Sequence, residues 1–298
     1  GGRQRLTRPF PVTFYALGQD AQLRALWQHL SDRPGEITLS RARRMDVFKR
    51  DAVTALGITV KNPYQARQVF QQTATLFPNL EYADADLHIS LRFAAETGAF
   101  PLAYCRVAAD QEHQLQDIEV LEDAWTLKTL PIPLRTMSLS PNVAPHHARP
   151  HRLMVEIEDE TYQFDLHIWR ALLVNLRALI QRHDPDLLLT DWGDTWLLPH
   201  LLQGSEAHHI PLGLNRERSR GVSWRKERTY FSYGQIIYRG QQIHLFGRCH
   251  IDRQNAMLWD DYALEGSIEV SRVTALPLQT AARVSPGTGI SSIEMLTA

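Results

Sequence analysis

The clearest pattern of hydrophobic and polar positions lies in the middle of the chain. Apolar residues recur there at the spacing of a helix with one buried face: Ile168, Leu172, Leu173, Leu176, Leu179 and Ile180. The spacing predicts an amphipathic helix over 169–182 that packs on a sheet. We expect this helix to end at Asp184-Pro185-Asp186, because proline disfavours the helical region for the residue before it.

The residues after this helix indicate a buried strand, a turn and a second helix. Leu187 to Leu189 is a short apolar run, as in a buried strand, and Gly193 interrupts it. Asp194 and Thr195 are both good N-cap residues for the helix that follows. Open α/β sheets hold their ligand sites where a strand ends in such a turn. The pattern therefore places a candidate site here.

Local signals predict further elements on either side. Residues 10–17 and 57–61 are strand-like, and Asn62 followed by Pro63 predicts a helix start, with asparagine as the cap and proline at the first position. In the second half the expected elements are a strand over 134–139, a loop over 140–150, a hairpin over 153–164 and two strands over 230–246 that turn at Arg239-Gly240. These elements indicate an α+β unit followed by an α/β unit.

Composition adds bounds on compartment and partners. The chain has 298 residues and a net charge of -1, so no global basic field points to nucleic acid. Cys105 and Cys249 lie far apart, which favours reduced thiols and a cytoplasmic location. No apolar run approaches the roughly 20 residues of a membrane span, so we expect no membrane partner.

Positive charge is concentrated locally. Residues 41–50 are basic, which favours a solvated helix face, with a phosphate contact as the alternative. Residues 216–228 contain two acidic residues and six basic ones, a local net charge of +4: Arg216, Arg218, Arg220, Arg225, Lys226 and Arg228. Trp224 and Tyr230 interrupt or flank this segment. This segment could bind a single strand of nucleic acid, with its basic side chains neutralising phosphates and its aromatic rings stacking on bases. Alternatively, it could form a solvated hairpin.

The stretch from His183 to Leu202 resembles the second exonuclease motif of family B DNA polymerases. The match includes Asp184-Pro185-Asp186 at its start and Leu198-Pro199-His200-Leu201 at its end. The catalytic aspartate of the family stands just before that Leu-Pro. In this chain the position is occupied by Leu197.

Four further segments resemble the family in the expected order: Tyr82 to Phe100, Gly247 to Asp252, Tyr262 to Pro277 and Ser285 to Ser292. The resemblance implies an α+β N-terminal-like domain over 1–125. It also implies a ribonuclease-H-like, exonuclease-like domain over 126–298, with a mixed sheet flanked by helices. The fold class is then α/β. A C-terminal polymerase domain would be a partner if the chain is a fragment.

The resemblance also implies a chemistry. Exonucleases of this family hold two divalent metals with four carboxylates, and a tyrosine orients the attacking water. Carried over residue by residue, the first motif gives Ser138 and Ser140, the second gives Leu197, and the third gives Tyr262 but Gly266 for its aspartate. All four ligand positions lack an acid, so we expect a degenerate exonuclease with no metal cofactor.

The residues leave three functions open. The first is a non-catalytic module that binds single-stranded or primer-template DNA. The second is an active nuclease using Mg²⁺ or Mn²⁺, with Glu156, Glu158 and Asp194 as replacement ligands, and Asp191 or Glu265 as further substitutes. The third is a structural or protein-docking remnant. The paired loop histidines, such as His146-His147, are not expected to bind zinc, because a zinc site needs converging ligands.

Overall fold

The computed structural model describes residues 3–31, 35–46, 51–127, 130–217, 219–232 and 235–297. The chain divides into two compact units, one of residues 1–99 and 104–121, the other of residues 100–103 and 122–298. The division after residue 121 lies a few residues before the expected boundary at 125. None of the helices in the described ranges combines the length and apolar character needed to cross a lipid bilayer.

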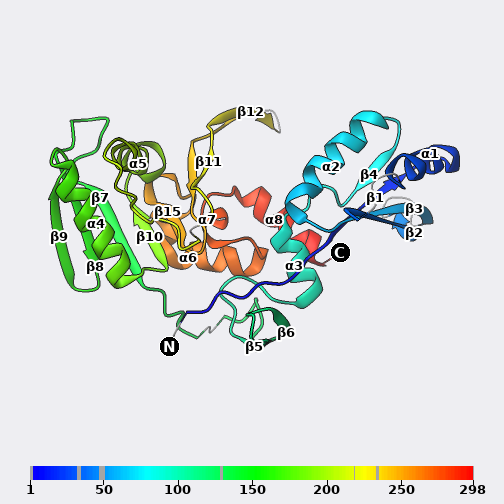
Figure 1. The fold of residues 1–298 in the computed structure, drawn as a ribbon, viewed down its shortest axis with the longest axis horizontal. Helices are drawn as coiled ribbons and strands as arrows, with labels where there is room; N and C mark the ends of the chain where they lie inside the picture. The colour runs from blue at the N-terminus through cyan, green and yellow to red at the C-terminus, as the bar shows by residue number, and fades with distance from the viewer. Residues whose placement is uncertain are drawn as a thin grey trace. The chain divides into compact units, whose positions relative to one another are not determined.

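The first unit contains a four-stranded sheet with two helices packed on it and a separate two-stranded hairpin (Figure 1). Its elements are β1 (Val12–Leu17), α1 (Asp20–Ser31), β2 (Ile37–Asp46), β3 (Asp51–Val60), α2 (Pro63–Leu76), β4 (Glu81–Ala83), α3 (Ile89–Thr97), β5 (Cys105–Ala109) and β6 (Leu115–Val120). The sheet order is β2-β3-β1-β4, with antiparallel neighbours throughout.

Two expectations in this unit have opposite outcomes. The start of α2 is confirmed, because the Asn62 side chain accepts a hydrogen bond of 3.1 Å from the backbone N–H of Tyr64 and Pro63 begins the helix. The helix expected over 41–50 is wrong for its described part, because residues 41–46 belong to β2 and pair with β3 over its full length. Residues 47–50 lie outside the described residues.

The second unit is built on a five-stranded mixed sheet in the order β15-β10-β7-β8-β9. Its elements are β7 (Thr136–Pro141), β8 (Arg152–Ile157), β9 (Glu160–Asp165), α4 (Trp169–His183), β10 (Leu187–Thr190), a π-helical turn η1 (Gly193–Leu197), α5 (Leu198–Ala207), β11 (Ser223–Arg225), β12 (Arg228–Ser232), β13 (Gln235–Arg239), β14 (Gln242–His244), β15 (Cys249–Asp252), η2 (Arg253–Asn255), α6 (Trp259–Thr274), α7 (Leu278–Ala281) and α8 (Pro286–Thr297).

The five-stranded sheet combines parallel and antiparallel strands. Strands β15, β10 and β7 are parallel, and β8 is antiparallel to both β7 and β9. Helix α4 covers one face and buries five of the six apolar residues that the helical spacing indicated, whereas Ile168 precedes the helix and is exposed. The expected mixed sheet flanked by helices is confirmed.

Two local expectations in this unit are wrong. Asp194 and Thr195 do not cap a helix, because they lie inside η1, and α5 begins only at Leu198. The turn expected at Arg239-Gly240 is displaced, because β12 pairs with β13 and Ser232 lies opposite Gln235. Arg239 ends β13, and residues 240–241 connect it to β14, which pairs with β11.

Candidate exonuclease-like and nucleic-acid-binding site

The first-motif positions lie on β7, the central strand of the five-stranded sheet. Met137 and Leu139 are fully buried in the core under α4, so Ser138 and Ser140 face the opposite side of the sheet. The register places Glu156 of β8 beside Ser138. Serine hydroxyls are neutral, so these two positions do not supply the charge that a pair of divalent metals requires.

The second-motif position is part of the apolar core. Leu197 ends η1, has no exposed surface, and packs in the same cluster as Leu198, Leu201 and the α4 leucines. An aspartate at this position would bury a charge among aliphatic side chains. Leu197 therefore serves packing, and its side chain lies on the α4 side of the sheet.

The third-motif positions lie in α6. Tyr262 is 63% exposed, and Ala263 directly after it has non-helical backbone angles, so the helix is broken at this point. A Cβ atom added at Gly266 would approach the Tyr262 Cβ to 2.4 Å. An acid at position 266 would thus require α6 to move.

The three replacement ligands are not brought together. Glu156 is exposed on β8, Glu158 occupies the β8–β9 turn with φ of 53°, and Asp194 is completely buried. Over the described ranges, no group of three or more His, Cys, Asp or Glu residues is placed to hold a metal ion. The Asp191 carboxylate forms an ion pair with Arg253, which donates two hydrogen bonds to it over 2.8 and 2.9 Å.

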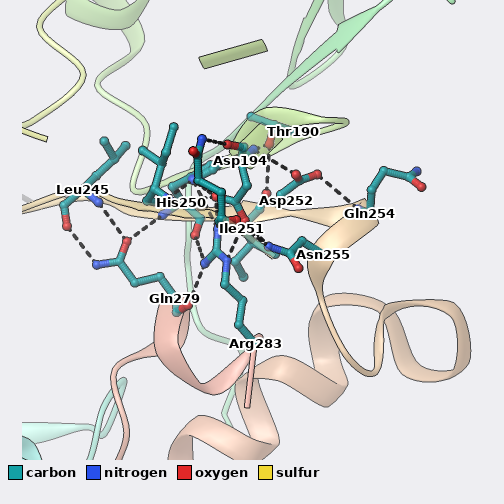
Figure 2. A network of polar contacts seen from close by, with 12 residues as sticks. Thr190, Asp194, Leu245, His250, Ile251, Asp252, Gln254, Asn255, Gln279 and Arg283 are labelled. Atoms are coloured by element: carbon teal, nitrogen blue, oxygen red, sulfur yellow. Dashed lines mark hydrogen bonds and ion pairs between the residues drawn. The ribbon is translucent and has the colours of Figure 1, made fainter. Parts of the chain in front are cut away.

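Asp194 is the centre of a buried polar network at the carboxyl ends of β10 and β15 (Figure 2). Arg283 of the segment after α7 donates to both carboxylate oxygens, over 2.9 and 3.1 Å. The backbone N–H of Ile243 and the side chain of Asn255 donate the remaining hydrogen bonds, over 2.7 and 2.8 Å. Four donors thus saturate the carboxylate, which leaves it structural.

His250 forms the second half of this network. Its Nδ1 lies 2.7 Å from the Ile243 carbonyl, which can only accept, so Nδ1 carries the proton and Nε2 accepts from the Thr190 hydroxyl 2.8 Å away. A Cβ at Gly193 would lie 1.8 Å from the Thr190 Oγ1. Glycine at 193 is therefore required for the turn to pack against Thr190 and His250.

Burial and charge set the protonation of this network. Burial disfavours ionisation of Asp194, but the charges of Arg283 and His250 and its hydrogen bonds outweigh it, so the pKa of Asp194 is lowered. Burial, and then the charge of Asp194, raise the pKa of Asp252 to about 6. Burial and Arg283 lower the pKa of His250 to about 4, which keeps the imidazole neutral near pH 7.

Arg216, the first residue of the basic segment, is turned inward. It bonds to Asp184 and Asp186 over 2.7 and 2.8 Å, and to the carbonyl oxygens of Asp184, Pro185 and Gly247. Arg248 reaches Asp184 from the other side, over 3.1 Å. Arg216, which the sequence suggested as a DNA contact, thus joins the end of α4 to the turn before β15.

The other basic residues are arranged differently. The Arg220 guanidinium lies 4.9 Å from the Phe246 ring centroid, and Arg218 lies outside the described residues. Exposed side chains follow on β11, the start of β12 and their connection: Trp224, Arg225, Lys226 and Arg228. These two strands are drawn in yellow and gold in Figure 1. Tyr230 lies within β12.

No model of a known protein family and no curated protein sequence matches this chain. Among solved structures, the family B DNA polymerase from the hyperthermophilic archaeon Pyrobaculum calidifontis matches 96% of the chain, with a TM-score of 0.66 and 16% sequence identity. This chain has the fold of part of a family B DNA polymerase. It spans 45% of that polymerase's length.

The polymerase fold confirms the resemblance that the sequence motifs indicated. The site residues that the sequence did not reveal are Arg283, Asn255 and His250, the partners of Asp194 and Thr190. His250 lies in the segment Gly247 to Asp252, which resembles the family's Gly-Arg-x-His-x-Asp pattern. No other signal in the sequence indicated that His250 is part of a site. Arg283 lies 89 residues from Asp194, and no local pattern connects the two.

Proposed function

We propose that this chain is a non-catalytic, nucleic-acid-binding part of a family B DNA polymerase-like protein that acts in DNA replication or repair. One observation carries the proposal: the polymerase fold is kept while serine, serine, leucine and glycine occupy the four ligand positions, Ser138, Ser140, Leu197 and Gly266. Neutral side chains cannot hold a pair of divalent metals, so the domain needs no metal cofactor in this function.

The exposed basic strands support binding to a single strand or a primer-template. Trp224 is 48% exposed and offers a ring on which a base can stack, and Arg225, Lys226 and Arg228 beside it can neutralise phosphates. If the chain is a fragment, the second partner is a polymerase domain, for which this module provides a scaffold.

The test is single-strand binding as a function of salt. For single strands, the slope of log affinity against log salt is about -0.7 per neutralised phosphate. The variant with Lys226→Ala and Arg228→Ala is expected to lose about one to one and a half slope units. The matched control, Arg152→Ala with Arg182→Ala, removes the same charge from exposed positions of the same unit and should leave the slope unchanged.

Two outcomes would contradict the proposal. Single-strand binding that does not weaken with salt would show that phosphates are not neutralised, and the chain would then be a structural remnant. Equal slopes for the Lys226/Arg228 variant and the control would show that these exposed strands are not the contact surface. A lowered slope in the first variant alone is the result we expect.

A further inference from the structure

A cavity of about 440 Å³ opens beside the carboxyl ends of the sheet strands in the second unit. It is lined by residues 145–150 after β7, residues 166–167 between β9 and α4, Trp169 at the start of α4, and positions 196 and 200 of η1 and α5. Because β7 and β9 both run antiparallel to β8, their carboxyl ends meet at one edge of the sheet. Ligand sites of α/β sheets lie at this edge, and the volume is within the usual range for small-molecule sites.

The cavity wall is rich in cationic and proton-accepting groups. It contains Arg149 and four histidines: His146, His147, His167 and His200. Within the described part of the chain, no Asp or Glu lines it. Helix α4 begins at the cavity with Trp169, so the positive end of the helix dipole lies beside it, next to the Asp165 carboxylate that accepts a hydrogen bond of 2.7 Å from the His167 backbone N–H. The wall therefore suits an anion.

Aromatic rings form another part of the wall. The Trp196 and His200 rings stack with centroids 4.9 Å apart, and Trp169 lies 4.8 Å from His200. Burial, and then the charges of Arg149 and His167, lower the pKa of His200. Burial by itself attracts no anion, but the positive charges of Arg149 and His167 do. Anion binding beside indole rings is the chemistry that recognises a phosphate attached to a base.

We propose that this cavity binds one nucleotide unit, with its phosphate held by Arg149, His167 and the start of α4, and its base against Trp169 or Trp196. The inference rests on the proposed function in one respect only, that the chain meets nucleic acid. The nucleotide can come from a free nucleoside monophosphate or from a DNA strand. The cavity is separate from the exposed strands that contain Lys226 and Arg228.

The test is calorimetric titration of the full chain with dAMP, and separately with a short single-stranded oligonucleotide. Arg149→Gln is expected to weaken binding roughly tenfold or more, because hydrogen bonds to charged groups commonly contribute that much. His167→Gln should weaken it in the same direction. The control is Arg182→Gln, thirteen residues along α4 from Trp169 and thus about 20 Å away, which should bind like the wild type.

Binding of dAMP that depends on Arg149 would show that a free nucleotide suffices. Binding of the oligonucleotide alone, again weakened by Arg149→Gln, would identify a DNA strand as the source. Either result supports the inference. Wild-type affinity in both cavity variants, or no binding of either probe, would overturn it. Oligonucleotide binding that needs Lys226 and Arg228 but not Arg149 would overturn it while leaving the proposed function intact.

Discussion

Asp194 occupies a position where the local pattern indicated a helix cap, but its carboxylate is an internal anchor. It is completely buried, and Arg283 neutralises it through two hydrogen bonds. Breaking a buried ion pair by removing one partner costs far more than the pair contributes, because the remaining charge stays buried without compensation. The role of Asp194 is therefore set by a residue that is distant in sequence.

The variant Arg283→Gln is expected to lower the free energy of unfolding by about 3–5 kcal/mol, because it leaves Asp194 charged and unpaired in the core. Denaturant titration of the second unit measures the effect. Arg182→Gln, on the exposed end of α4, is the control and should stay within about 0.5 kcal/mol. A loss below about 1 kcal/mol in Arg283→Gln would mean that the ion pair is absent in solution.

Acid should weaken the fold through the buried histidines. His250 and His244 have pKa values of about 4 and about 3 in the folded chain, whereas the unfolded chain protonates histidine near pH 6.5. The unfolded state therefore binds more protons below pH 6.5, and stability falls as the pH drops. Asp252, with its pKa raised to about 6, acts in the opposite direction between about pH 4 and 6.

Removing that opposing group makes a testable difference. The stability of Asp252→Asn should fall more steeply on acidification from pH 6 to pH 4 than that of the wild type, by up to about 1.4 kcal/mol per pH unit. Thermal or denaturant unfolding across this range measures the slope. Asp159→Asn, on the exposed turn after β8, is the control. A shallower slope in Asp252→Asn would contradict the assignment.

At the scale of helices and strands, the sequence correctly predicted the elements that depend on contacts between residues close together in the chain. The start of α2 followed from Asn62 and Pro63, and α4 followed from the helical spacing of its leucines. The sequence pattern did not predict strand β2. Its arginine-rich segment pairs with β3, and a local pattern does not reveal which strands pair. The position of the β12–β13 turn was missed for the same reason. The cavity at 145–150 was also invisible, because it is formed by four separate segments.

Arg216 gives a prediction at this scale. It connects the end of α4 to the turn before β15, so Arg216→Ala should lower the free energy of unfolding by about 2 kcal/mol and leave the salt slope of DNA binding unchanged. The Lys226/Arg228 variant should show the reverse pattern. Denaturant unfolding and the salt dependence of single-strand binding, measured for both variants, distinguish a structural arginine from a DNA contact. A reduced salt slope in Arg216→Ala would show that this arginine contacts DNA after all.

At the scale of the whole molecule, the chain has the fold of part of a family B DNA polymerase, and the four residues that the motif resemblance aligns with metal ligands are uncharged. The structure matches a family B DNA polymerase over 96% of the chain, with a TM-score of 0.66. The positions that the motif resemblance aligns with metal ligands lie on β7, at the end of η1 and in α6, and they hold two serines, a core leucine and a glycine in close contact with Tyr262. The motif order was visible in the sequence, whereas the burial of Leu197 and the contact at Gly266 required the structure.

The most direct test is degradation of a 3′-labelled single strand in Mg²⁺ or Mn²⁺. We expect no degradation by the wild-type chain, because two metals cannot be held without the four carboxylates. The variant with Glu156→Ala and Glu158→Ala serves as the control for contaminating nucleases. Degradation by the wild type that disappears in this variant would contradict the account, because Glu156 and Glu158 would then be ligands of a working nuclease.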